Sequence, residues 1–132
     1  MKDSFTTSKT YFESQKHAIH GLIAIIKNER NFRIQLVAAL LVILLGIFLK
    51  ISHTAWIAVG FLIALVLISE AFNSVIEALS DTISNKYDVN IKYAKDVSAG
   101  CVLVSAVASV ILGIIIFTPY IIPIITNILE RL

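Results

Sequence analysis

Residues 54–81 read TAWIAVGFLIALVLISEAFNSVIEALSD, and this stretch decides the fold. Residues 54–68 contain no charged side chain, which is typical of a helix that crosses a membrane. Residues 69–81 contain neither Gly nor Pro, so the helix is predicted to continue into polar sequence without a break. Glu70 then lies beside the apolar run, where an ionisable side chain is costly and usually indicates a functional site.

The composition is that of a membrane protein. The chain has 132 residues, of which 58% are hydrophobic and only 15% are charged, and its mean hydropathy is +0.87. Such a chain is too apolar for an ordinary soluble domain, and its few Gly and Pro residues do not suit a turn-rich β fold. We therefore predict one all-α integral membrane domain over residues 1–132, with no nucleic acid among its partners.

Hydropathy divides the chain into a surface helix, three membrane-spanning helices and a tail. The surface helix is predicted at about residues 12–30, and the spans at residues 32–50, 54–82 and 96–118. The third span is expected to stop before Pro119, because proline cannot continue a helix. Residues 119–132 are then expected to form an interfacial tail.

The segment before the first span is amphipathic. Its apolar side chains recur at helical spacing, at Phe12, Ile19, Ile23 and Ile26. Lys16, His20 and Lys27 fall on another side, so the helix is expected to lie on a membrane surface. Arg33 and Gln35, at the start of the first span, are close enough to its end to reach the interface.

Basic residues are distributed unevenly about the spans. Of the 11 Lys and Arg residues, only Lys50 and Arg131 lie on the side opposite the N-terminus. Basic residues concentrate on the cytoplasmic side of membrane proteins. The N-terminus and the loop at residues 81–96 are therefore predicted to face the cytoplasm, with the protein in the cell membrane.

Polar side chains of the opening stretch share one face. At about 100° per residue, four of them fall within an arc of roughly 80°: Glu70, Asn73, Glu77 and Asp81. At about 1.5 Å per residue from Thr54, Glu70 lies about 24 Å into a hydrocarbon core of about 30 Å. Glu77 lies about 10 Å further along, in the cytoplasmic headgroup region.

Charged side chains of the other helices are expected at the depth of Glu77. The same arithmetic, applied to the other two spans, places Glu29, Lys95 and Asp96 at that level to within a turn. Glu29 and Glu77 are suitable oxygen ligands for Mg²⁺, which usually keeps water and substrate phosphates as its other ligands. Lys95 supplies a positive charge for phosphate.

Glu70 is placed to accept the proton of a hydroxyl group at the membrane edge. Asn73, one turn away, could orient Glu70 or bind a phosphate oxygen. A base inside the membrane and a metal site outside it suit phosphoryl transfer from a nucleotide to a lipid alcohol. Two other interpretations remain open: a small proton-coupled transporter that uses Glu70, and a noncatalytic scaffold whose carboxylates at the helix end are simply solvated.

Three separated motifs resemble a single family. EAFNSVIEALSD at residues 70–81, AKDVSAGCVL at 94–103 and NERNFRIQ at 28–35 are similar to the signature of the small prokaryotic lipid kinases, the diacylglycerol kinase and undecaprenol kinase family. The resemblance covers about residues 21–113. It implies an ATP- and Mg²⁺-dependent kinase that phosphorylates a membrane lipid alcohol, assembled as a homotrimer with active sites shared between protomers.

The resemblance also implies roles for particular residues. It assigns catalysis to Glu70, Mg²⁺ binding to Glu29 and Glu77, and nucleotide binding to these two carboxylates together with Asn73, Tyr87, Lys95 and Asp96. Thr10 and His17 stand where the diacylglycerol kinase branch places an arginine and a tyrosine. This departure favours the Gram-positive branch, and undecaprenol over diacylglycerol as the substrate.

Overall fold

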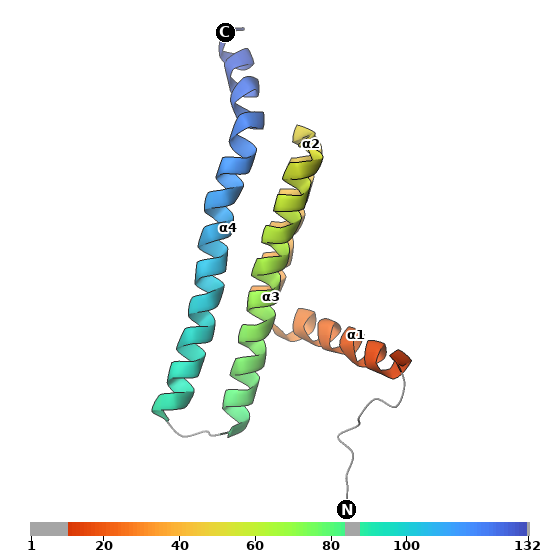
Figure 1. Ribbon diagram of the computed structural model, residues 1–132, viewed down its shortest axis with the longest axis vertical. Coiled ribbons are helices and arrows are strands. Elements are labelled where there is room, and N and C mark those ends of the chain that lie inside the picture. The colour runs from red at the N-terminus through yellow and green to blue at the C-terminus, as the bar shows by residue number, and fades with distance from the viewer. Residues whose placement is uncertain (1–10, 84–87, 132) are drawn as a thin grey trace, which may run out of the picture.

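The computed structural model describes residues 11–83 and 88–131, and within these ranges it consists of four α-helices (Figure 1). The helices are α1 (Tyr11–Asn28), α2 (Arg30–Leu49), α3 (His53–Ile83) and α4 (Val89–Leu129). Three of them, α2, α3 and α4, are long and apolar enough to cross a membrane. The predicted all-α membrane fold with three spanning helices is confirmed.

The three long helices run side by side, and α1 leaves them at a steep angle (Figure 1). The most extensive packing is between α3 and α4, and α2 packs mainly on α3. Large apolar side chains cover the outer faces of all three and are exposed. Helices that are apolar on every side are suited to a lipid environment, as expected for a membrane protein.

A tight turn joins α2 to α3. Lys50 follows α2 in the left-handed conformation with φ of 50°, and the amide of Ile51 donates a hydrogen bond of 3.2 Å to the carbonyl of Gly46. Glycine is required at position 46, because a Cβ atom there would lie 2.8 Å from the Trp56 ring. Ile51 is buried and packs in a core cluster with Val59 at this end of the bundle.

The predicted end of the third span before Pro119 is wrong. α4 continues through Pro119 and Pro123, so residues 119–129 are helical, and their predicted interfacial position stays a prediction. Membrane helices tolerate proline because hydroxyl side chains and small local adjustments satisfy the backbone groups that it frees. The carbonyls that lack an amide donor because of Pro119 and Pro123 are those of Ile115 and Pro119, whereas the hydroxyls of Thr118 and Thr126 donate to the carbonyls of Ile114 and Ile122 at 2.6 and 3.2 Å.

Tyr120 attaches the last part of α4 to the turn between α2 and α3. Its hydroxyl donates to Ser52 Oγ at 3.1 Å and accepts from the Ser52 amide at 3.1 Å. Phe117, one turn earlier, is buried in the same core cluster as Ile51. These contacts on both sides of Pro119 explain why the chain remains helical there.

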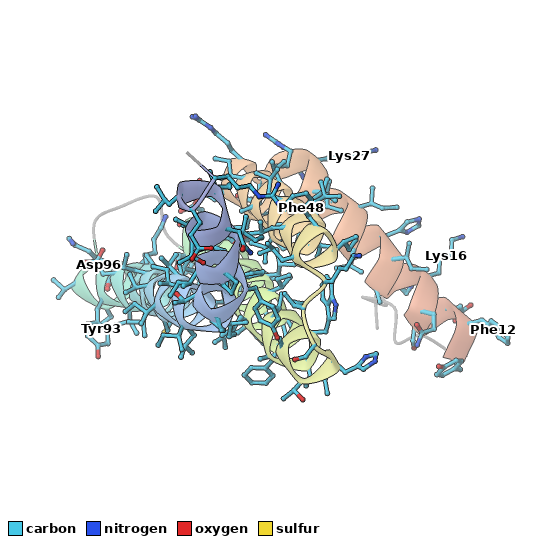
Figure 2. The ribbon with its side chains drawn as sticks, turned by 90° about the horizontal axis from the view of Figure 1, so that it is seen from above. Phe12, Lys16, Lys27, Phe48, Tyr93 and Asp96 are labelled. Carbon is cyan, nitrogen blue, oxygen red and sulfur yellow. The ribbon has the colours of Figure 1, made fainter. Side chains whose placement is uncertain are left out.

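Arg33 connects α1 to α2. Its Nη1 donates to the carbonyls of Ile26 at 3.1 Å and Lys27 at 2.7 Å, which satisfies acceptors in the last turn of α1. α1 itself buries no residue. Figure 2 shows it projecting from the bundle with Phe12 at its far end and Lys16 and Lys27 along its length. Its predicted position on a membrane surface stays a prediction.

The start of α4 lies earlier than the predicted residue 96. The carboxylate of Asp88 accepts hydrogen bonds from the amides of Asn90 at 2.8 Å and Ile91 at 3.2 Å. Asp is among the preferred residues at this position, because its side chain satisfies amides that lack a partner within the helix. Lys95 and Asp96 therefore lie more than a turn inside α4.

Candidate active site

The polar face of α3 becomes steadily less buried toward the end of the helix. Glu70 and Asn73 are only 3% and 7% exposed, Glu77 is half-buried, and Asp81 is exposed. Of the side chains predicted to share one face of α3, Glu70 and Asn73 are therefore packed inside the bundle, whereas Asp81 lies outside it. A carboxylate as buried as Glu70 requires a hydrogen-bond partner.

Gln35 of α2 is that partner. Its Nε2 donates to Glu70 Oε2 at 2.9 Å. Gln35 was expected to reach the interface, but its side chain turns into the bundle instead. The bond uses one oxygen of the carboxylate, and Gln35 Oε1 is buried with no hydrogen-bond partner.

Asn73 joins α3 to α4 one turn further on. Its Nδ2 donates to Glu77 Oε1 at 3.3 Å, and its Oδ1 accepts from Ser98 Oγ at 2.7 Å. Asparagine suits this position because it offers a donor and an acceptor at once. Asn73 was expected either to orient Glu70 or to bind a phosphate oxygen; its hydrogen bonds go to Glu77 and Ser98 rather than to Glu70, and phosphate binding stays a prediction.

Ser98 is the site residue that sequence reasoning missed. Its hydroxyl donates to Asn73 and is also within 2.9 Å of the Lys95 carbonyl in its own helix. The signal was present, since Ser98 follows Lys95 by three residues and therefore lies on the same face of α4.

Lys95 and Asp81 form an ion pair between α4 and α3. Lys95 Nζ lies 2.8 Å from Asp81 Oδ1, with the lysine side chain 37% exposed and the aspartate 71%. The pair lies at the open end of the site, so a phosphate group that binds Lys95 must compete with Asp81. A pair this exposed is worth little free energy, and competition is easy.

Asp96 lies apart from these residues. It pairs with Lys92 in the adjacent turn of α4, and its side chain is 63% exposed. In Figure 2, Asp96 and Tyr93 lie on the side of the bundle away from α1. The structure therefore does not bring Asp96 together with Glu70 and Asn73 within one chain. Tyr87, also predicted to bind nucleotide, lies outside the described residues.

Glu29 occupies the corner between α1 and α2. It is half-buried, and its side chain makes no capping bond to α2. Among residues 11–83 and 88–131, no group of three or more His, Cys, Asp and Glu side chains could hold a metal ion. Mg²⁺ does not need such a cage, because it is commonly bound by one or two carboxylates together with substrate phosphates and water. Glu29 and Glu77 have the right donor chemistry for that kind of site.

The arrangement defines a class of protein. It is a small membrane protein with a hydrogen-bonded carboxylate buried within its spanning helices, and a polar network connects that depth to charged groups at one end. Residues 16–117 match the family model described as prokaryotic diacylglycerol kinase. The chain belongs to this family, whose members are lipid kinases, and the kinase interpretation replaces the transporter and scaffold alternatives.

Individual relatives agree with the family. The chain is 36% identical over 118 residues to undecaprenol kinase of Bacillus subtilis. This match covers 89% of this chain and 96% of the relative. It is 31% identical over 113 residues to a diacylglycerol kinase of Synechocystis, covering 85% of this chain and 65% of the relative. It is 34% identical over 91 residues to diacylglycerol kinase of Escherichia coli K12. This match covers 69% of this chain and 75% of the relative.

Proposed function

We propose that the protein transfers the γ-phosphoryl group of ATP to the hydroxyl of undecaprenol at the cytoplasmic side of the cell membrane. One observation carries the proposal: Glu70 is 3% exposed within a spanning helix and is hydrogen-bonded to Gln35, below the network of Asn73, Glu77 and Ser98. A base at this depth is suited to a hydroxyl that stays in the membrane while ATP stays outside it.

The likeness to relatives supports undecaprenol over diacylglycerol. The match to the Bacillus undecaprenol kinase spans 96% of that protein, whereas the matches to the diacylglycerol kinases of Synechocystis and E. coli span 65% and 75% of theirs. Diacylglycerol remains the alternative substrate, and both lipids are therefore included in the test below.

The reaction follows from the placement of the side chains. Glu70 accepts the proton of the lipid hydroxyl as that oxygen forms a bond to the γ-phosphorus, while the bond between the γ-phosphorus and the bridging oxygen of ADP breaks and ADP leaves. Lys95, released from Asp81, neutralises phosphate charge. Mg²⁺ held by Glu29 and Glu77 would supply further charge neutralisation on the phosphates. Positioning and electrostatics account for most of the rate in such reactions.

The assembly proposed is a homotrimer. Asp96 lies on the side of the bundle away from α1 (Figure 2), is 63% exposed and pairs with Lys92. In an assembly whose sites are shared between protomers, an outward Asp96 can contribute to the site of a neighbouring copy. This gives the exposed Asp96 a role that a single chain does not.

The test is a phosphorylation assay with purified protein, labelled ATP, Mg²⁺, and undecaprenol and diacylglycerol side by side. We expect label in undecaprenyl phosphate, and its loss in Glu70→Gln with binding of Mg²⁺-ATP retained. Glu130→Gln serves as the control. It makes the same chemical change directly after α4, far along the chain from Glu70, where the side chain is exposed. Preferential labelling of diacylglycerol would support the alternative substrate, and no labelled lipid at all would refute the kinase proposal.

A further inference from the structure

An apolar cavity of about 390 Å³ lies between α2, α3 and α4. Gln35, Leu67 and Ala106 line it at the end toward Glu70, and Val59 and Phe117 line it at the other. At about 1.5 Å per residue, the lining positions along each helix extend over roughly 12 to 16 Å. The cavity volume lies within the range of about 300 to 1,000 Å³ found for small-molecule sites.

The cavity is continuous with the candidate active site through Gln35. This residue lines the cavity and also donates to Glu70 from Nε2. On α3, Val66 and Leu67 line the cavity, and Glu70 is the next residue on that face. A molecule in the cavity therefore has one end beside the proposed catalytic base.

The polar groups of the cavity are few. Gln35 and Ser109 are the polar residues among those that line it. Gln35 Oε1 and Ser109 Oγ are also the two buried side-chain atoms without a hydrogen-bond partner in the described part of the chain. Buried polar atoms normally have partners, so these two atoms leave room in the cavity for a polar group, and Gln35 Oε1, which only accepts, suits a donor such as a hydroxyl.

We propose that this cavity binds the part of a polyprenol chain next to its hydroxyl, with the hydroxyl between Gln35 and Glu70. The inference rests on the proposed function and specifies its substrate class. A polyprenol has no polar atom besides its hydroxyl, which matches the apolar lining. A diacylglycerol carries two ester groups beside the hydroxyl, and only Gln35 and Ser109 of the lining could donate hydrogen bonds to their carbonyls, because the other lining side chains are apolar.

Gly113 allows the cavity to be shortened without disturbing the bundle. It lines the cavity on α4, about two turns beyond Ser105, and a Cβ atom there would meet no atom within 4 Å. Gly60 on α3 also has nothing within 4 Å of a Cβ atom, but it does not line the cavity. Gly113→Leu and Gly60→Leu therefore make the same change inside and outside the cavity, and both improve the helix propensity.

The test compares the two variants with undecaprenol and with a ten-carbon isoprenoid alcohol, too short to reach position 113. We expect Gly113→Leu to raise the KM for undecaprenol by about tenfold. The KM for the short alcohol should change by less than about twofold, because the added side chain blocks only a long chain. The Gly60→Leu variant should have the same KM as the unmodified protein for both alcohols. If the two variants behave alike while the unmodified protein is active, the cavity proposal is wrong and the kinase proposal stands; an unmodified protein inactive on every alcohol overturns both.

A second measurement needs no variant. A polyprenol with a photoreactive group in its second isoprene unit is irradiated with the unmodified protein, and the labelled residues are located by mass spectrometry. Label on half-buried cavity residues such as Val66, one turn from Glu70, supports the proposal. Label confined to lipid-facing positions such as Leu103 and Val104, which are 65% and 69% exposed, contradicts it.

Discussion

Gln35 Nε2 donates a hydrogen bond of 2.9 Å to Glu70 Oε2, and this bond joins α2 to α3 inside the membrane-spanning part of the bundle. The bond fixes one oxygen of the carboxylate and leaves the other to accept a proton. Gln35 thus positions the proposed base, and in the cavity proposal its Oε1 also faces the substrate hydroxyl.

Replacing Gln35 tests this positioning role. We expect Gln35→Leu to lower kcat by about tenfold to a hundredfold, because a misplaced base loses its alignment with the reacting hydroxyl. The KM for Mg²⁺-ATP should stay the same, since Gln35 contacts neither Asn73 nor Glu77. Steady-state kinetics with both substrates varied provide the measurement. Gln15→Leu in α1, where the side chain is exposed, is the matched control, and a change confined to KM for ATP would argue against this role.

Removal of the Ser98 hydroxyl should weaken nucleotide binding. Ser98→Ala leaves Asn73 Oδ1 without its donor, so Glu77 is held less firmly. We expect a loss of about 1 kcal/mol in unfolding free energy and a several-fold rise in KM for Mg²⁺-ATP. Unfolding in detergent and initial rates measure the two effects. Ser69→Ala, whose hydroxyl bonds only within its own helix to Leu65, should change neither quantity.

The ion pair of Lys95 and Asp81 predicts opposite effects for its two members. Lys95→Ala removes the charge proposed to bind phosphate, and we expect KM for ATP to rise by about tenfold. Asp81→Asn removes the competitor, and we expect KM to fall by up to about fivefold, because an exposed pair is worth about 1 kcal/mol or less. The fall should shrink as salt is added. A rise in KM for Asp81→Asn would mean that Asp81 itself helps to hold the nucleotide.

Tyr120 should matter for stability but not for activity. Tyr120→Phe removes the hydroxyl that bonds to Ser52, and we expect a loss of about 1 kcal/mol in unfolding free energy. Activity should remain within about twofold of the unmodified protein, because Tyr120 lies at the opposite end of the bundle from Glu77. Tyr93→Phe, at an exposed position near the start of α4, is the control for stability. Equal stability of the two variants would show that the hydroxyl contributes nothing.

Helical periodicity was sufficient to predict the face formed by Glu70, Asn73 and Glu77. Such a face depends only on the spacing within one helix, and the sequence of α3 contains no residue that interrupts it. The three spans followed from hydropathy for the same reason. These parts of the site were local properties of the chain.

Contacts between helices could not be predicted in the same way. The direction of Gln35, the bond from Ser98 to Asn73 and the outward position of Asp96 depend on how each helix is rotated against its neighbours. The continuation of α4 past Pro119 was missed because the proline rule describes a helix in isolation, whereas Tyr120 and Phe117 hold this part of α4 against the rest of the bundle.

The buried carboxylate lies near one end of the bundle only, and the turn between α2 and α3 carries no comparable group. On the proposed function, the protein can therefore act only on alcohols whose heads lie in the cytoplasmic leaflet. An alcohol released in the outer leaflet must flip across the bilayer before it is phosphorylated. The charged product then stays in the leaflet where it was made, because a phosphate group crosses hydrocarbon poorly.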